Sequence, residues 1–159
     1  MRLFGRVFGR GRPAAVPLVD DGTLRLVGSG LDPVRGDSAV LDDVARAGHD
    51  LTEPVLVRQL FTLHDLADRP ALVAALAENG YDVDQVVRAA GGAGDPRDSE
   101  AGDRADGSCA EQLVGRKTQV LTVLSASQAR ARLTGLETRL AVHYLGWEAL
   151  APPPAARPA

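Results

Sequence analysis

The chain has 159 residues, which is room for one ordinary domain with tails but not for two large domains. Its apolar share of 45% is that of a globular protein and excludes a wholly disordered chain. With one Trp, two Tyr, three Phe and no Ile, the core has to be built mainly from Leu and Val. A net charge of −3 argues against a protein that coats nucleic acid through its overall field.

Cys109 is the single cysteine, so an internal disulfide and a CxxC zinc site are both excluded. No stretch approaches the roughly 18 to 20 apolar residues of a membrane-spanning helix. Near the start, Arg2, Arg6 and Arg10 interrupt the apolar residues before a signal-peptide core can form. These features predict a cytoplasmic protein that does not contact a membrane.

Both ends and one internal segment have the composition of irregular chain. Residues 1–36 begin as a Gly-rich basic arm and continue without a periodic pattern. Residues 90–108 are acidic and offer nothing apolar larger than Ala to bury, which predicts a disordered loop inside the domain. Residues 151–159 are mostly Pro and Ala and are expected to form a disordered tail. The folded domain should therefore span residues 37–150.

The domain is expected to open with a short helix. Asp37 or Ser38 can cap its start, and Gly48 would end it. Between them, apolar side chains recur at helical spacing at Val40, Leu41, Val44 and Ala47.

A strand, a helix and a second strand are predicted next. Residues 55–63 alternate in hydrophobicity, which is the pattern of a strand. The following apolar residues have a helical period that starts from Asp65 or Asp68 and ends at Gly80, a residue suited to a left-handed C-cap. Residues 81–87 then alternate again and predict a strand with one solvent-exposed face.

The second half repeats this order after the acidic loop. Residues 113–121 predict a strand, although their middle is polar. Ser125 and Gln128 form a capping box, and the apolar stripe that follows extends the predicted helix to Leu140. Residues 141–148 predict the final strand.

The order β-α-β, loop, β-α-β after residue 50 predicts an α+β fold. Two right-handed crossovers side by side give the ferredoxin-like sandwich, in which one antiparallel sheet carries two helices on one face. The short helix near residue 37 would precede it.

Residues with catalytic or metal-binding chemistry are few and scattered. His49, His64 and His143 are not spaced as metal ligands or as a nucleophile and its base. Cys109 follows an acidic loop, where negative charge would disfavour the reactive thiolate. We therefore predict no catalytic residue, no metal site and no cofactor.

Two features remain as candidate partner-binding sites, and the first is basic. Arg130, Arg132 and Arg139 lie on the last predicted helix, Arg116 and Lys117 come just before it, and these basic residues are opposed nearby only by Glu137. They would make that side of the domain positive, with an ordinary solvent-exposed helix face as the alternative interpretation.

The second candidate is the final strand, in which both faces carry large side chains. Simple alternation places His143, Leu145 and Trp147 on one face and Val142 and Tyr144 on the other. Tyr144 and Trp147 are candidate partner contacts, while a core position is the alternative for Trp147.

Three stretches in fixed order resemble one known family. They are AGHDLTEP at residues 47–54, GYDV at residues 80–83 and YLGW at residues 144–147. Their order and spacing over residues 41–147 are similar to those of the ribonuclease E inhibitor B family, also called regulator of ribonuclease activity B. The resemblance implies a ferredoxin-like fold and a protein inhibitor that binds ribonuclease E and alters messenger RNA degradation, without enzymatic activity of its own.

We therefore expect a non-catalytic protein-binding regulator whose partner is a ribonuclease E-type enzyme. A ferredoxin-like nucleic-acid-binding module is the first alternative, and it would need aromatic side chains on the open sheet face for base stacking. The sequence offers few such side chains other than Phe61, Tyr81 and Tyr144. A small-ligand regulatory domain is the second alternative.

Overall fold

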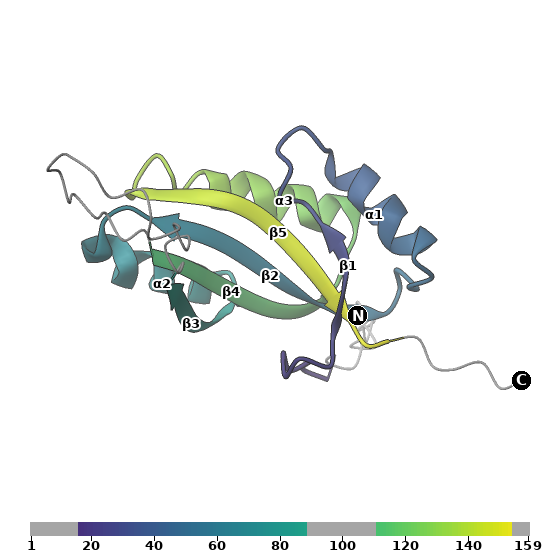
Figure 1. Ribbon diagram of the computed structural model, residues 1–159. Helices are drawn as coiled ribbons and strands as arrows, with labels where there is room; N and C mark the ends of the chain where they lie inside the picture. The colour runs from purple at the N-terminus through teal and green to yellow at the C-terminus, as the bar shows by residue number, and fades with distance from the viewer. Residues whose placement is uncertain (1–15, 89–110, 154–159) are drawn as a thin grey trace, which may run out of the picture.

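The computed structural model describes residues 16–88 and 111–153 (Figure 1). In this part the chain is α+β, with a five-stranded antiparallel sheet and three α-helices. The predicted loop at residues 90–108, Cys109, residues 1–15 of the predicted N-terminal segment and residues 154–159 of the predicted tail lie outside the described residues. The elements are, in chain order, β1 (Arg25–Ser29), α1 (Asp37–Arg46), β2 (Pro54–Leu63), a 3₁₀ turn (Leu66–Asp68), α2 (Arg69–Glu78), β3 (Asp82–Arg88), β4 (Glu111–Val120), α3 (Val123–Thr134) and β5 (Val142–Ala151).

The sheet has the strand order β1-β5-β2-β4-β3, and each neighbouring pair is antiparallel. β2 and β4 pair along their whole length, from Pro54 opposite Val120 to Leu63 opposite Glu111. β5 flanks β2 on its other side, so β2 is the central strand. The predicted succession of strands and helices after residue 50 is confirmed.

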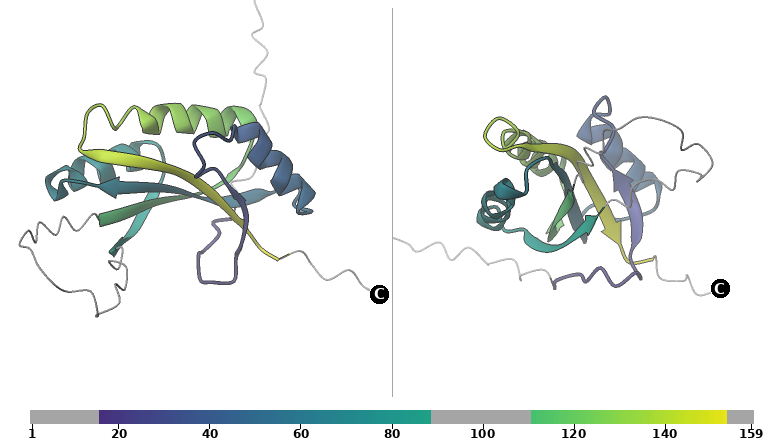
Figure 2. Two further views of the ribbon diagram at one scale, coloured as in Figure 1. Left: turned by 45° about the horizontal axis from the view of Figure 1, so that its top comes forward. Right: turned by 60° about the vertical axis from the view of Figure 1, so that its left-hand side comes forward.

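Helices cover one face of the sheet, and Figure 2 shows α2 and α3 together on the same side of it. The odd-numbered residues of β2 point to that face, as the alternation predicted. Phe61 and Leu63 pack with Leu72 and Leu76 of α2 in one core cluster. The second cluster joins α1 and α3 to the opposite end of the sheet and contains Val40, Leu41, Val55, Val57, Leu121, Ala126, Trp147, Ala149 and Ala151.

The predicted ends of α2 are confirmed. Pro70 lies in its first turn, where a missing N–H costs no hydrogen bond. Gly80 follows the helix with φ +75°, the left-handed conformation that glycine adopts without steric cost.

The start of α3 differs from the predicted one. Thr122 is the N-cap, and its hydroxyl accepts a hydrogen bond from the Ser125 N–H at 3.1 Å. Ser125 reciprocates by accepting from the Thr122 N–H at 2.9 Å. The capping box therefore lies three residues earlier than predicted. Ser125 was expected to be its first residue and Gln128 its second, whereas Thr122 is the first and Ser125 is the second. The helix ends at Thr134, and turns carry the chain on to Leu140.

β1 is a strand that was not predicted, since residues 1–36 were expected to be irregular. Arg25–Ser29 pairs with the end of β5, where Arg25 lies opposite Ala151. β5 correspondingly runs to Ala151, beyond the predicted end of the domain. Gly28 allows this packing because a Cβ there would lie 2.5 Å from a methyl carbon of Val44 in α1.

β5 contains a bulge that overturns the predicted alternation. Leu60 pairs with Gly146 but Phe61 pairs with Tyr144, so Leu145 is an extra residue in the strand. The bulge puts Tyr144 and Trp147 on the same face of the sheet, where both are buried against the helices. It also turns the residue after Trp147, Glu148, to the opposite face.

Candidate functional site

The second face of the sheet carries no helix in the described part of the chain. β2 presents its even-numbered residues to it, because Gln59, Phe61 and Leu63 are buried on the helix side. At the centre, Leu60 lies directly opposite Val114 of β4, and both are half-buried. We call this surface the open face and define it by Arg58, Leu60, Thr62, Val114, Arg116 and Glu148.

Charged side chains cluster at one end of the open face. Arg58 of β2 lies directly opposite Arg116 of β4, a pairing of like charges that is unfavourable by itself. Two carboxylates offset it. Glu148 accepts hydrogen bonds from Nε and Nη2 of Arg58 at 3.1 and 2.5 Å. Asp20 lies 3.3 Å from Arg58 and 3.7 Å from Arg116.

A short segment before β1 crosses the edge of this cluster. The backbone N–H of Leu18 donates to the Thr118 hydroxyl of β4 at 2.8 Å, and Asp20 makes the ion pairs just described. The segment helps to bury Leu56, which is 2% exposed although it points away from the helices. We call residues 17–20 the strap.

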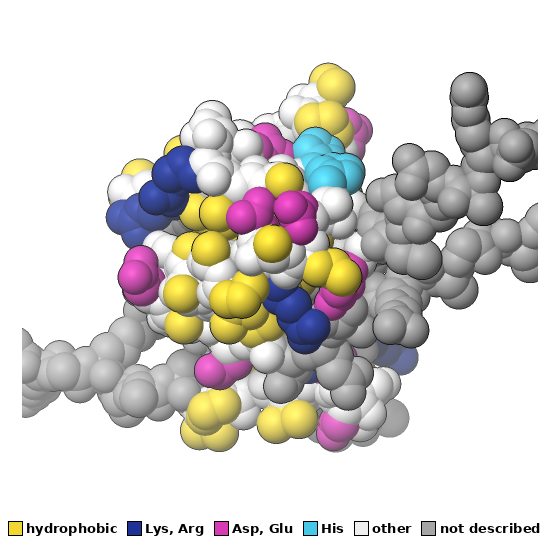
Figure 3. All heavy atoms as spheres, turned by 90° about the vertical axis from the view of Figure 1, so that its left-hand side faces the viewer, with side chains coloured by type: hydrophobic (Ala, Val, Ile, Leu, Met, Phe, Trp, Pro, Cys, Tyr) yellow, Lys and Arg dark blue, Asp and Glu magenta, His cyan; other side chains and the backbone are white. Residues whose placement is uncertain are grey.

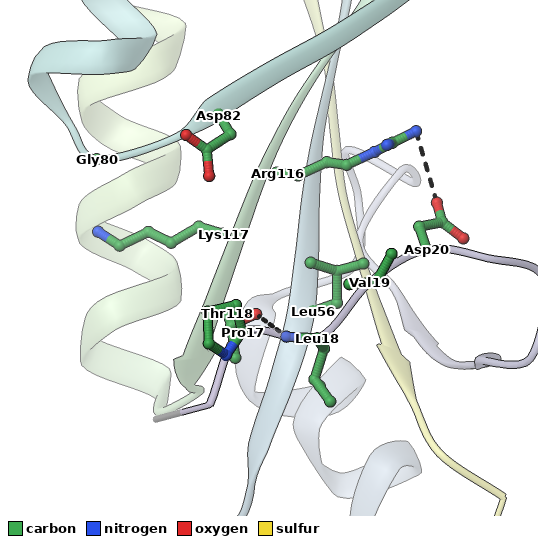
Figure 4. A pocket seen from close by; sticks show the side chains of 10 residues that line it. All are labelled: Pro17, Leu18, Val19, Asp20, Leu56, Gly80, Asp82, Arg116, Lys117 and Thr118. Carbon is green, nitrogen blue, oxygen red and sulfur yellow. Dashed lines mark hydrogen bonds and ion pairs between the residues drawn. The ribbon is translucent and has the colours of Figure 1, made fainter. Parts of the chain in front are cut away.

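A half-open cavity of about 560 Å³ lies between the strap and β4 (Figure 4). Asp20 and Asp82 bring negative charge to its lining, and Arg116 and Lys117 bring positive charge. A cavity with both signs of charge is suited to polar groups of a protein or peptide more than to a run of phosphates. Its lining consists of Pro17, Leu18, Val19, Asp20, Leu56, Gly80, Asp82, Arg116, Lys117 and Thr118.

Arg130, a predicted partner-binding residue, is committed to an internal ion pair instead. Its Nε and Nη2 donate to Asp37 at 3.0 and 2.8 Å, and Nη2 also donates to the Gly30 carbonyl at 3.2 Å. Asp37 is 7% exposed and accepts two further hydrogen bonds, from Trp147 Nε1 at 2.9 Å and from the Ser127 hydroxyl at 3.1 Å. This cluster ties the start of α1 to α3, β5 and the chain after β1.

The environment of Asp37 keeps its carboxylate ionised. Burial by itself would raise the pKa of Asp37, because it disfavours the charged form. The hydrogen bonds from Arg130, Trp147 and Ser127 and the charge of Arg130 outweigh burial, so the pKa of Asp37 lies below its ordinary value of 3.8.

This lowered pKa predicts a pH-dependent stability. A carboxylate whose pKa is lower in the folded state stabilises the fold above the unfolded value of 3.8, and the contribution is lost as the pH falls through the folded value. We expect the difference in unfolding free energy between the native chain and Asp37→Asn to be constant near neutral pH and to shrink below about pH 3.8. Urea denaturation at a series of pH values measures it, with the exposed Asp42→Asn of the same helix as control. A difference that persists to the most acidic pH at which the chain folds would contradict this assignment.

Tyr144 is also buried, so the side chain does not reach the surface as a predicted partner contact would. Its hydroxyl donates to Oε1 of Gln59 at 2.7 Å, and Nε2 of Gln59 donates to the hydroxyl of Tyr81 at 3.1 Å. Burial raises the pKa of both tyrosines, so the phenols stay protonated and neutral. Trp147 is 1% exposed and also belongs to the core. A core position was the alternative to a partner contact that the sequence left open for this residue.

The three predicted arginines do not form one basic surface. Arg130 faces Asp37, while the exposed Arg132 lines a small cavity between α3 and β4. Arg139 lies in the turn after α3, in a hollow of about 320 Å³ against Ala71 and Ala75 of α2. Figure 3 views the end of the sheet where β5 begins, and its Lys and Arg atoms lie in separate places around a group of hydrophobic side chains.

The charge cluster of the open face was not predicted as a site. Arg116 was assigned to the basic side of the last helix, but it points to the opposite face of the sheet. The local signal that could have indicated this cluster was Arg58, a charged residue within an apolar strand. Its partner Glu148 could not be placed without the bulge in β5.

Histidines and acids do not converge on a metal site within residues 16–88 and 111–153. His143 instead contacts Glu137 through Nδ1 at 2.8 Å, and the same carboxylate oxygen accepts the Tyr144 N–H. Across these same residues, no helix has the length and apolar character needed to span a membrane.

Comparison with known proteins identifies no relative: no protein-family model, curated protein or solved structure matches the chain.

Proposed function

We propose that this chain is a non-catalytic, ferredoxin-like regulator that binds a protein partner of the ribonuclease E type through its open face. The order β5-β2-β4-β3 supports the ferredoxin-like assignment, because it is the order that two interleaved β-α-β units produce. α2 connects β2 to β3, and α3 connects β4 to β5. The motifs at residues 47–54, 80–83 and 144–147 support the choice of partner.

The observation that carries the proposal is the composition of the open face. Half-buried Leu60 and Val114 lie at its centre, and the ion-paired Arg58, Arg116 and Glu148 lie beside them. An apolar centre with a polar rim is the usual anatomy of a protein interface. The surface is also formed by central strands of a sheet, so it is rigid before a partner arrives.

The nucleic-acid alternative has less support from the same face. Base stacking would need aromatic side chains there, but Phe61, Tyr81 and Tyr144 are at most 7% exposed and pack with the helices. Phosphates bind by attracting uncompensated basic groups, whereas Arg58 already faces two carboxylates. A protein partner can use both signs of charge.

A cleavage assay tests this proposal directly. Added chain is expected to slow RNA cleavage by a ribonuclease E-type enzyme, with a stoichiometry set by the enzyme and not by the RNA. The titration is run at two RNA concentrations and two salt concentrations. Inhibition that vanishes when RNA is raised, together with direct RNA binding that falls steeply with salt, would favour the nucleic-acid alternative. No inhibition under any of these conditions would contradict the choice of partner.

A pair of matched variants locates the surface. Thr62→Arg adds a long charged side chain to the open face, next to the pair Leu60 and Val114, and is expected to weaken inhibition by about tenfold or more. Thr134→Arg makes the same change at the exposed end of α3 and should leave inhibition unchanged. Circular dichroism verifies that both variants fold. Equal inhibition by the two variants would show that the partner binds elsewhere.

A further inference from the structure

A second cavity lies on the other side of the sheet, where α3 crosses β4. Its volume is about 170 Å³, well below the roughly 300 to 1,000 Å³ of clefts that enclose drug-sized ligands. We call it the α3–β4 cavity, and its lining consists of Asn79, Tyr81, Lys117, Gln119, Ser125, Gln128, Ala129, Arg132 and Leu133.

Two cationic side chains face this cavity from different elements. Lys117 comes from β4 and Arg132 from α3. Lys117 is half-buried, and its ammonium group donates to the backbone carbonyl of Asn79 at 2.9 Å. The same nitrogen lies 5.3 Å from the centre of the Tyr81 ring, within cation–π range. Both contacts stabilise the ammonium without neutralising its charge.

Carboxylates are absent from the lining of the α3–β4 cavity as the structure describes it. Asp82 borders Lys117 in the neighbouring cavity on the strap side, but no ion pair joins the two. Half-buried charged groups are usually paired with an opposite charge. Lys117 and Arg132 therefore give the α3–β4 cavity a positive potential that the described side chains do not offset.

Two further polar groups of the lining are neutral amides that can donate hydrogen bonds. Gln128 comes from α3, and Gln119 comes from β4 beside Lys117. The Ser125 hydroxyl borders the cavity but donates to the Thr122 carbonyl at 3.0 Å. An anion in the cavity would meet an ammonium, a guanidinium and these donors together. Multiple donors around two cations are the groups that recognise a tetrahedral oxyanion.

We propose that the α3–β4 cavity binds a phosphate group, either as inorganic phosphate or as the phosphoryl end of a small phosphomonoester. Lys117 contributes a point charge fixed by Asn79 and Tyr81, and Arg132 contributes a planar pair of donors. The small volume admits the phosphate alone, so the rest of a phosphomonoester would remain outside the cavity. This site is separate from the open face, and the proposed regulatory function does not depend on it.

Isothermal titration calorimetry and thermal melting of the full chain test the site, with inorganic phosphate and adenosine monophosphate as separate probes. Sodium chloride at the same ionic strength controls for general salt effects. Each probe that binds should raise the melting temperature above the chloride control, because a ligand of the folded state stabilises it. Tighter binding of the nucleotide would identify a phosphomonoester as the ligand, and equal or tighter binding of phosphate would identify the free ion.

Variants decide whether the cavity is the site of binding. Lys117→Gln and Arg132→Gln should each weaken binding by about tenfold or more, since each removes a charge-assisted hydrogen bond. Arg139→Gln removes an equally exposed arginine outside the cavity and should bind as the native chain does. Arg132 is exposed, so its replacement leaves the core intact and keeps the test valid even if Lys117→Gln folds poorly. Absence of binding by both probes, or equal weakening in Arg139→Gln, would overturn the proposal.

Discussion

Replacing Gly146 by Ala is expected to destabilise the chain by about 2 to 5 kcal/mol. Gly146 has φ +128°, a conformation that costs a side-chain-bearing residue about 1 to 2 kcal/mol. A Cβ would also lie 2.4 Å from the Gly30 carbonyl oxygen and 3.0 Å from the Leu31 Cα, both backbone atoms that cannot rotate away. Overpacking of this kind adds about 1 to 3 kcal/mol.

Gly48→Ala is the matched control for this substitution. Gly48 has φ +85°, but no atom lies within 4 Å of the position its Cβ would take. It should therefore lose only the conformational part, about 1 to 2 kcal/mol. Urea denaturation followed by the fluorescence of Trp147, the single tryptophan, measures both variants. Equal losses would show that the contact between the bulge and Gly30 contributes nothing.

The Gly146 bulge matters for the open face as well as for stability. The extra residue Leu145 places Trp147 toward the helices and Glu148 toward Arg58. A variant that removes the bulge while still folding would separate Glu148 from Arg58. The core and the proposed binding surface therefore depend on the same irregularity of one strand.

Asp37→Ala is expected to cost about 3 to 5 kcal/mol of unfolding free energy. The substitution leaves the half-buried guanidinium of Arg130 and the indole N–H of Trp147 without their acceptor. Removing one member of a buried ion pair lowers the unfolding free energy by much more than the intact pair raises it, because an uncompensated charge then remains inside the protein. Trp147 is fully buried, so water cannot replace the lost acceptor without opening the core.

Asp43→Ala on the same helix provides the comparison. Asp43 pairs with Arg35 and Arg46 at the surface, where solvent screens the charges and ion pairs contribute little to stability. Thermal and urea denaturation of the two variants should therefore separate them clearly. Similar losses would mean that the buried cluster around Asp37 stabilises the fold no more than a surface ion pair does.

The sequence by itself determined the class of the fold and the order of its elements after residue 50. These features follow from local rules, since hydrophobic period distinguishes residues 55–63 as a strand and Gly80 marks the end of α2. Burial of Phe61 and the helix-side residues of β2 could be predicted from alternation for the same reason.

Only the tertiary structure decided the features that depend on partners distant in the chain. β1 is a strand because β5 offers it a free edge, and its five residues carry too weak a pattern to predict this. The charge cluster needs the register that sets Arg58 opposite Arg116 and Glu148, residues 58 and 90 positions away. The bulge at Gly146 arises from pairing with β2 and reverses the alternation of everything after it, which no local periodicity reveals.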